Sequence, residues 1–227
     1  MTGARPDFHL EDVIRRLSGE PDPVIVGVDE VGTGAWAGPI VAAAVALDAS
    51  VQLPLYDELN DSKLLSKKTR ERLEPVIRLD ALYVGIGVAT TREINLAGVG
   101  RARELALERA YYQVLAQCAV PLAAVVDGRS LRKLRDVFGK FSLFADRADQ
   151  KSLSVAAASI VAKVTRDHMM WILDAVNQGY GFREHVGYGT PQHRAALELL
   201  GPCEIHRMSV KPVQRIAERS IVTTREE

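Results

Sequence analysis

The hydrophobic positions of the chain form short continuous apolar runs that alternate with segments of helical spacing. The apolar runs predict buried β-strands at residues 24–28, 40–47, 81–89, 122–126 and 141–145. The amphipathic segments predict helices at residues 8–17, 66–79, 91–118 and 153–176, with Ser66 as the N-cap of the second. Strands that alternate with helices predict an α/β fold with a sheet flanked by helices, in which sites lie at strand ends.

Two adjacent acids, Asp29 and Glu30, follow the first apolar run and precede the second. Carboxylates at the end of a buried strand are costly to desolvate unless a cation meets them. The next residues include Gly32, Gly34 and Gly38, which leave the backbone open to close approach by a ligand. A metal ion together with a phosphate backbone would satisfy both observations.

Length and charge limit the interpretation further. The 227 residues, 47% of them hydrophobic, fit one ordinary domain with a small appendage. We expect a leader helix at residues 1–20, a main domain at 21–215 and a tail at 216–227. Basic and acidic residues are equal at 29 each, which argues against a strongly basic coat but not against a local basic groove. Residues 63–72 and 129–140 each carry five cations and one acid, as expected of either a nucleic-acid contact or a solvated face.

The two cysteines, Cys118 and Cys203, form no CxxC pair, so neither a disulfide framework nor a structural zinc site is expected. The polar N-terminus does not resemble a signal peptide, and no apolar run approaches the ~20 residues of a membrane span. These features predict a cytoplasmic protein that does not enter a membrane.

Four acids share a similar setting in the sequence. Asp29, Glu30 and Asp127 end apolar strands beside glycine, and Asp149 lies just before the helix predicted at 153–176. Taken singly, each acid is better explained as a helix-cap or loop residue than as a metal ligand. Taken together, they could hold two divalent cations about 3.5–4 Å apart for in-line phosphoryl hydrolysis.

Six segments, in this order and spacing, resemble type 2 ribonuclease H (ribonuclease HII): VDEVGTGAWAGPIVAAAV (28–45), NDSKLLSKKTRERL (60–73), VVDG (125–128), DQKSLSVAAASIVAKVTRDHMM (149–170), YGFREHVGYGTPQH (180–193) and HRMSVKPV (206–213). The resemblance implies a ribonuclease H-like mixed sheet flanked by helices, with a C-terminal helical and loop extension. It implies hydrolysis of the RNA strand of RNA–DNA hybrids, and of ribonucleotides embedded in DNA, giving 5′-phosphate and 3′-hydroxyl ends. It also implies that Asp29, Glu30, Asp127 and Asp149 hold two Mg²⁺ or Mn²⁺ ions in a monomeric enzyme.

Asp146 and Asp167 compete with Asp149 for the fourth position. The family's acid lies six residues before the apolar residue that opens the AAAS segment, and counting back from Val155 gives Asp149. Asp167 lies eighteen residues beyond Asp149, roughly 27 Å along a straight helix, so the two acids cannot serve one metal pair.

The resemblance also implies the residues that contact the substrate. They are Gly32, Thr33 and Gly34 in the turn, Ser62 and Lys63 in DSK, Ser159 and Lys163 at i,i+4 on one helix, and Tyr188 in GYG. The glycine amides would read the ribose 2′-hydroxyl, and Tyr188 would stack on the neighbouring deoxyribose. Each has a simpler alternative: a tight turn, a solvated lysine, a small packing residue or a surface loop.

The chain departs from the family at two positions. Thr33 replaces the arginine of the usual G-R-G turn, and Val186 stands where a lysine usually precedes GYG. The DEVGTG stretch also resembles ribonuclease HIII, which favours long hybrids. A preference for long hybrids is therefore one alternative. A non-catalytic hybrid-binding protein and a nucleotide-dependent phosphotransferase are alternatives from other classes, although no GxxxxGK[ST] loop is present.

Overall fold

A computed structural model describes residues 5–20, 23–118, 120 and 122–223. The chain forms two compact units. The first contains residues 1–31, 41–88 and 104–164, and the second contains residues 32–40, 89–103 and 165–227. The expected division into a leader, a main domain and a tail stays a prediction.

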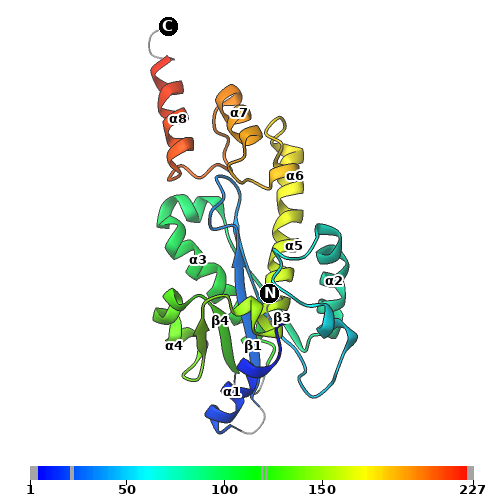
Figure 1. Ribbon diagram of the computed structural model, residues 1–227. Coiled ribbons are helices and arrows are strands. Elements are labelled where there is room, and N and C mark those ends of the chain that lie inside the picture. Colours follow the sequence, from blue (N-terminus) through cyan, green and yellow to red (C-terminus); the bar gives the residue numbers. More distant parts are fainter. Residues whose placement is uncertain (1–4, 21–22, 119, 121, 224–227) are drawn as a thin grey trace. The chain divides into compact units, whose positions relative to one another are not determined.

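A five-stranded mixed sheet is the centre of the first unit (Figure 1). Its strands are ordered β3-β2-β1-β4-β5. Strand β1 pairs antiparallel with β2 and parallel with β4, and β4 pairs parallel with β5. The strand bounds are β1 Val24–Val31, β2 Ile40–Ala46, β3 Tyr83–Ala89, β4 Leu122–Asp127 and β5 Leu143–Ala145. The predicted α/β class and its mixed sheet are confirmed.

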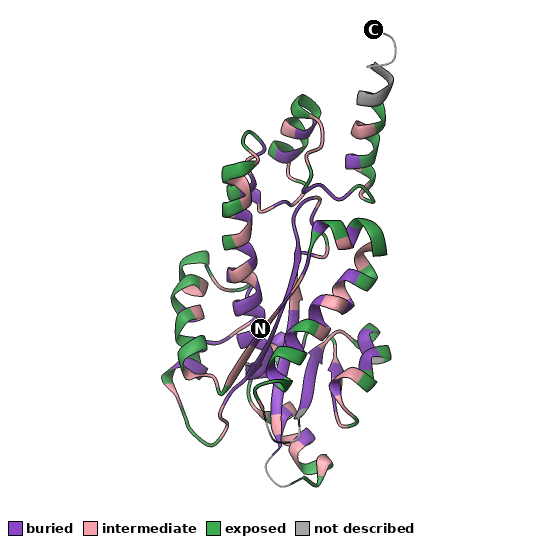
Figure 2. Ribbon diagram, turned by 180° about the vertical axis from the view of Figure 1, so that it is seen from behind, coloured by how far each residue is buried: buried purple, intermediate pink, exposed green. Residues whose placement is uncertain are grey.

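The central strands β1 and β2 are largely buried because their sequences are apolar on both faces. Every residue of β2 is buried, as expected of a strand covered on both sides. The strands at the centre of the sheet are largely purple, which marks buried residues, in Figure 2. Glycines in the strands let helices approach closely. A Cβ at Gly27 would lie 2.1 Å from the Ser154 carbonyl carbon, and one at Gly87 would lie 1.8 Å from the Ala106 carbonyl oxygen. The backbones of the flanking helices therefore lie directly on the sheet at these two positions.

Two clusters of buried residues join the sheet to its helices. One packs the small residues of the first half of α5 against β2, α2 and η1, with Ala43, Ile160 and Ile77 as members. The other packs Ile14 of α1 against Ile25 of β1 and neighbouring residues. The helices as far as α5 are α1 His9–Ser18, η1 Pro54–Glu58, α2 Lys67–Asp80, α3 Thr91–Leu115, η2 Arg129–Leu134, α4 Arg135–Phe138, η3 Ala148–Gln150 and α5 Leu153–Val176.

The second unit is built from loops and short helices, with a core that contains Met170, Tyr180 and Phe182. Its helices beyond α5 are α6 Phe182–His185, α7 Pro191–Leu200 and α8 Lys211–Thr223. The C-terminal helical and loop part of the prediction is confirmed. Helix α8 continues past residue 215, so no change of secondary structure marks the predicted start of the tail.

The predicted elements are all present, although most of them begin or end one to three residues away from the predicted positions. Strand β1 continues to Val31, so Asp29 and Glu30 lie within the strand rather than after it. Strand β4 likewise includes Asp127. Helix α3 ends at Leu115 and is interrupted at Gly98, whose φ of 81° is not helical. Ser66 caps α2 as predicted, because its side chain accepts a hydrogen bond from the Thr69 N–H.

Candidate active site

The parallel pairing of β1 and β4 brings two of the predicted acids together. Val28 lies opposite Val126 in the register, so the next residues, Asp29 and Asp127, lie on neighbouring strands at the same edge of the sheet. Side chains at matching positions of parallel strands point to the same face. The sequence therefore places two carboxylates side by side through strand register alone.

Asp149 joins this edge through the short helix η3. The Ala148 N–H donates to Asp127 Oδ1 at 2.7 Å, which ties the segment that carries Asp149 to the end of β4. Asp149 is buried, with 3% of its surface exposed, and Asp29 is buried with 7% exposed. The structure brings three of the four predicted acids close in this way, and Glu30 is adjacent to Asp29 in the chain.

Burial and mutual repulsion change how these acids titrate. Burial, followed by the charges of Glu30 and Asp127, raises the pKa of Asp29 well above its usual range. Burial, together with the charges of Asp61 and Asp127, raises the pKa of Asp149 to about 6. Carboxylates that resist ionising together need a cation to become fully charged.

Asp61 is a member of this acidic group that sequence reasoning did not identify. It is buried with 4% exposed and shares a hydrogen bond with Asp149. Burial alone would raise the pKa of Asp61. Hydrogen bonds from the Lys63 N–H at 2.9 Å and the Gln150 amide at 3.1 Å nevertheless hold this pKa below its usual value. Asp61 is therefore a further carboxyl that interacts directly with Asp149 in this group.

Lys63 is the cation that faces the acids. Although burial works against it, the carboxylates of Asp61 and Asp149 hold the pKa of Lys63 above its usual value. The loop that carries Lys63 is fixed by Arg70, whose guanidinium donates to the carbonyl oxygens of Ser62 and Leu65 at 2.7 and 2.6 Å. Lys63 is exposed, so its ammonium is accessible to a phosphate while it remains near the acids.

Two of the predicted contact residues, Ser62 and Ser159, are buried and face each other. Their hydroxyl oxygens are 2.9 Å apart, and Ser159 also forms a hydrogen bond with Asp29. When Asp29 is ionised, Ser159 must donate to it and accept from Ser62. Lys163, one helical turn beyond Ser159, is half-buried. The serines therefore orient Asp29, and their predicted contact with substrate stays a prediction.

The competing acid Asp146 points elsewhere. It is exposed, accepts from the Arg129 N–H at 2.9 Å and forms an ion pair with the Arg129 side chain at 3.5 Å. Asp167 belongs to the second unit. Asp149 is the one of the three whose carboxyl interacts with Asp127 and Asp29.

The acidic group fits a divalent cation in its donor chemistry and its charge. All of its ligand atoms are carboxylate oxygens, the donors that Mg²⁺ and Mn²⁺ prefer. Among the described residues, no group of three or more His, Cys, Asp or Glu side chains is arranged to hold a metal ion as it stands. Asp29, Glu30, Asp127 and Asp149 are the residues that could hold one, and their mutual repulsion is what a cation would relieve.

The turn that carries Gly32, Thr33 and Gly34 lies in the second unit, where two arginines hold it. Gly32 has a φ of 93°, and a Cβ there would lie 2.3 Å from Arg166 Nε, so glycine is required. Gly34 is open on all sides and has no such requirement. Arg207 Nη1 donates to the Thr33 carbonyl oxygen at 3.1 Å.

Arg166 and Arg207 are both fully buried and donate to backbone carbonyl oxygens of residues 33–39 and 186. Arg166 reaches Pro39, Val186 and Ala37 at 2.9, 2.9 and 3.2 Å. Burial, followed by the charge of Arg166, lowers the pKa of Arg207 to about 9. Sequence reasoning missed both residues, although an arginine in each of TRDH and HRMS was the available signal.

Tyr188, the predicted stacking residue, is half-buried in the same unit. The Arg166 guanidinium carbon lies 5.4 Å from the centre of its ring, within the range of a cation–π contact. Val186 adopts the left-handed conformation, with a φ of 43°, which is unusual for a β-branched residue. Its carbonyl oxygen is the one that Arg166 Nη1 binds, so this contact helps to hold the strained residue.

The two basic segments differ in how their cations are engaged. In residues 63–72, Lys63 and Lys68 are exposed, whereas Arg72 pairs with Glu58. In residues 129–140, Arg129 pairs with Asp146 and Lys133 pairs with Glu104. The first segment therefore remains the better candidate for a phosphate contact.

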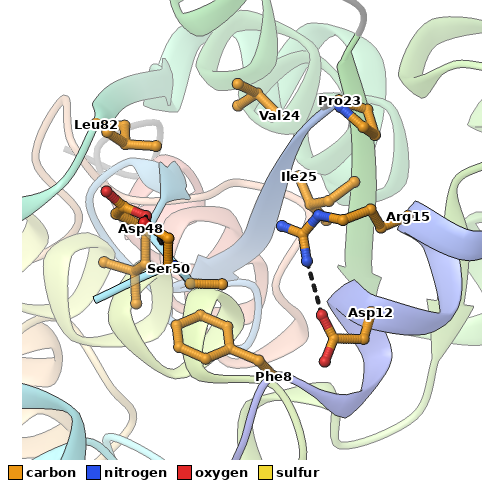
Figure 3. A pocket seen from close by; sticks show the side chains of 11 residues that line it. Phe8, Asp12, Arg15, Pro23, Val24, Ile25, Asp48, Ser50 and Leu82 are labelled. Atoms are coloured by element: carbon orange, nitrogen blue, oxygen red, sulfur yellow. Dashed lines mark hydrogen bonds and ion pairs between the residues drawn. The ribbon is translucent and has the colours of Figure 1, made fainter. Parts of the chain in front are cut away.

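A pocket of about 550 Å³ lies at the opposite end of β1 from the acids (Figure 3). Val24 and Ile25 line it where β1 begins, and an ion pair between Arg15 and Asp12 crosses one side at 2.7 Å. None of the predicted site residues lines it. No helix of the described part of the chain is long and apolar enough to cross a membrane.

The fold is that of the ribonuclease H enzymes. The ribonuclease HII of Archaeoglobus fulgidus, solved in complex with PCNA, superposes with a TM-score of 0.69 at 28% identity, covering 85% of this chain and 96% of that one. The ribonuclease H2 of Pyrococcus horikoshii has a TM-score of 0.66 at 24% identity, covering 86% and 97%.

The sequence comparisons narrow this class to one family. The family model for ribonuclease HII matches residues 26–213. The ribonuclease HII of Halorhodospira halophila is 43% identical over 197 residues, which is 85% of this chain and 94% of that protein. The ribonuclease HII of one Thermus thermophilus strain is 45% identical over 190 residues, which is 84% and 87%. The chain belongs to the ribonuclease HII family and is an endoribonuclease that cleaves the RNA of RNA–DNA hybrids.

Proposed function

We propose that Asp29, Glu30, Asp127 and Asp149 together hold two divalent cations, Mg²⁺ or Mn²⁺, and that the enzyme hydrolyses the RNA strand to leave 5′-phosphate and 3′-hydroxyl ends. The observation that carries the proposal is electrostatic. Burial raises the pKa of Asp29, and the charges of Glu30, Asp127 and Asp149 raise it further. Bound cations would remove this repulsion between the carboxylates. A ribonuclease HIII from another organism, similar in fold, has been solved with Mn²⁺.

The acids and the groups that contact them would have separate roles in hydrolysis. When bound, two divalent ions supply an activated water for attack on phosphorus and stabilise the departing 3′ oxygen. Asp29 is oriented for this by the Ser159 hydroxyl, and Asp127 by the Ala148 N–H. Asp149 would add its carboxylate to the group, where the charges of Asp61 and Asp127 oppose its ionisation until a cation is bound.

The substrate contacts belong to the same proposal. Lys63 is exposed beside the acids and would bind a phosphate, with Lys163 and the hydroxyls of Ser62 and Ser159 on the same unit. The turn of Gly32, Thr33 and Gly34 would read the ribose 2′-hydroxyl, and Tyr188 would stack on the adjacent sugar. Substrates would include DNA with embedded ribonucleotides as well as long hybrids.

The experiment is cleavage of labelled duplexes that carry one, four or many ribonucleotides, with Mg²⁺, with Mn²⁺ and with chelator. We expect cleavage only with a divalent ion, with 5′-phosphate products, and on all three duplexes. Products with 3′-phosphate or cyclic phosphate ends would contradict the proposed chemistry. Cleavage of the long hybrid alone would instead support a preference like that of ribonuclease HIII.

We also propose that the enzyme acts as a monomer in the cytoplasm. Cys118 and Cys203 are both free thiols, which suits a reducing compartment. Sedimentation with and without duplex would test the oligomeric state.

A further inference from the structure

Three buried histidines lie together in the second unit, outside the acidic group. His185, His193 and His206 are exposed by 7%, 0% and 1%. The His185 and His193 rings stack with their centres 4.4 Å apart, and His193 Nε2 lies 3.1 Å from His206 Nε2. A hydrogen bond between two ring nitrogens requires one of them to carry a proton and the other to lack it.

The backbone partners determine which nitrogen is which. The Cys203 N–H donates to His206 Nδ1 at 2.9 Å, so this nitrogen carries no proton, and the proton of neutral His206 is on Nε2. The Tyr188 carbonyl oxygen lies 2.9 Å from His193 Nδ1 and can only accept, so Nδ1 carries the proton of His193. His193 Nε2 is therefore free to accept from His206 Nε2–H.

The result is one chain of hydrogen bonds with a single direction. It runs from the Cys203 N–H through His206 and His193 to the Tyr188 carbonyl oxygen, and each ring in it is neutral. An added proton on either ring would place two donors face to face. His185 is fixed in the same way, because its Nε2 lies 2.8 Å from the Tyr180 carbonyl oxygen and its Nδ1 accepts from the Gly187 N–H.

The chain of hydrogen bonds ends on the loop that carries Tyr188, the predicted stacking residue. The Tyr188 N–H donates to the His185 carbonyl oxygen at 2.9 Å, and the Tyr188 carbonyl accepts from the Thr190 N–H at 2.8 Å as well as from His193. The backbone of Tyr188 is thus held on both sides, and its ring lies under the Arg166 guanidinium.

We propose that His193 and His206 are positioning residues for Tyr188: their neutral, one-directional hydrogen-bond chain fixes the Tyr188 backbone and so holds its ring in place to contact the nucleic acid. This inference rests on the proposed contact between Tyr188 and substrate. It assigns the histidines no contact with the reacting atoms.

The groups that face this pair include the stacked His185 and the Cys203 thiol, whose Sγ lies 3.1 Å from His206 Nδ1. The rings of Trp36, Tyr180 and Phe182 also pack against it. Burial, together with repulsion between the rings, lowers the pKa of His206 to about 4, and burial lowers the pKa of His193 to a similar value. Both rings are therefore neutral at neutral pH.

Two matched substitutions separate positioning from packing. His193→Asn puts an amide N–H where Nδ1–H was and keeps the donor to Tyr188. His193→Gln reaches the Nε2 position and loses that donor while it stays polar and similar in size. With the Tyr188 ring no longer held in place, His193→Gln should raise KM for duplex by about tenfold with kcat retained, as expected for the loss of one contact. His193→Asn should stay near wild type. His168→Asn, on an exposed histidine of the same unit, is the control.

The deciding measurement is a double-mutant cycle on KM with Tyr188→Ala, accompanied by ¹⁵N NMR of the histidine rings. We expect His193→Gln to add nothing in the Tyr188→Ala background, and the spectra to show His193 with its proton on Nδ1 and His206 with its proton on Nε2. Additive effects on KM would overturn the inference and leave the proposed function standing. The same holds if the spectra show a charged ring, or protons on the opposite nitrogens, at neutral pH. A Tyr188→Ala variant with unchanged KM would overturn the proposed Tyr188 contact and, with it, the functional part of the inference.

Discussion

Glu11 Oε1 accepts a hydrogen bond of 2.6 Å from Ser152 Oγ, which links the N-terminal helix α1 to the segment that precedes α5. The same oxygen accepts from the Ser154 N–H at 3.1 Å, in the first turn of α5. Glu11 is buried with 1% exposed, and Asp149 lies three residues before Ser152. The leader helix therefore holds the beginning of α5, beside the segment that positions Asp149.

Removing this carboxylate should destabilise the protein. Glu11→Ala leaves the buried Ser154 N–H without its acceptor, which costs about 1–3 kcal/mol of unfolding free energy. Glu11→Gln keeps an acceptor and removes a buried charge, so it should cost less. Urea unfolding measures both, with Asp12→Ala on the same helix as control, since its exposed ion pair contributes little. Equal losses for Glu11→Ala and Asp12→Ala would show that the Glu11 contact contributes nothing special.

Asp149→Asn should stabilise the metal-free protein while abolishing cleavage. The pKa of Asp149 is raised from 3.8 to about 6, so its charged form opposes folding at pH 8. This cost declines as the pH falls through 6 and is gone below 3.8. One pKa unit corresponds to about 1.4 kcal/mol, and we expect a gain of about 1–3 kcal/mol at pH 8 in chelator. Asp146→Asn, exposed and paired with Arg129, is the matched control. A variant that is less stable and still active would contradict the assignment.

Stability should also depend on the protonation of the histidine pair. In this case stability should fall, rather than rise, as the pH is lowered. The folded pKa values of His193 and His206 are lowered from 6.5 to about 4, so the unfolded chain binds protons more readily between these values. Stability is fully present above pH 6.5 and falls as the pH approaches 4, by up to about 3 kcal/mol for each ring. To isolate this effect, the free energy of unfolding is measured from pH 7.5 to 4.5 for two proteins. One carries Asp149→Asn alone, and the other carries both Asp149→Asn and His193→Asn. Parallel pH profiles for the two proteins would refute it.

Thr33→Arg should raise cleavage at a single embedded ribonucleotide relative to a long hybrid. One ribonucleotide offers one 2′-hydroxyl, so its recognition depends on few contacts, and Thr33 lacks the charged planar donors of arginine. A charge-assisted hydrogen bond contributes about 1.5–3 kcal/mol, or roughly tenfold or more in kcat/KM. Kinetics of wild type and variant on both duplexes measure the ratio, with Thr33→Gln as an uncharged control. An unchanged ratio would mean that Thr33 does not limit recognition.

Much of the fold and of the acidic group could be predicted from the sequence because the signals are local. Ser66 marks the start of α2, and α5 begins and ends at the predicted residues 153 and 176. The approach of Asp29 to Asp127 follows from two apolar runs that each end in an acid, once they pair in parallel.

The remaining features depend on tertiary contacts that no local pattern encodes. Asp61 in NDSK has the sequence of an ordinary turn, and its place beside Asp149 depends on how that loop packs. Arginine is rarely buried, so a sequence gives no reason to expect Arg166 and Arg207 in the interior. In the structure both are buried, and their guanidinium groups donate to carbonyl oxygens of distant segments. The protonation of His193 and His206 likewise follows from backbone groups that approach only in the folded chain.

The central claim is that the carboxylates of β1, β4 and η3 hold divalent cations for hydrolysis, and Asp29 tests it most directly. The measurement is a Mg²⁺ titration by calorimetry, together with single-turnover cleavage of a uniform RNA–DNA hybrid, for wild type and Asp29→Asn. The account predicts Mg²⁺ binding by wild type and cleavage that requires it. For Asp29→Asn it predicts weakened binding and a cleavage rate lower by at least about 100-fold, with unchanged unfolding cooperativity. Cleavage by wild type in chelator, or near-normal binding and cleavage by Asp29→Asn, would contradict it.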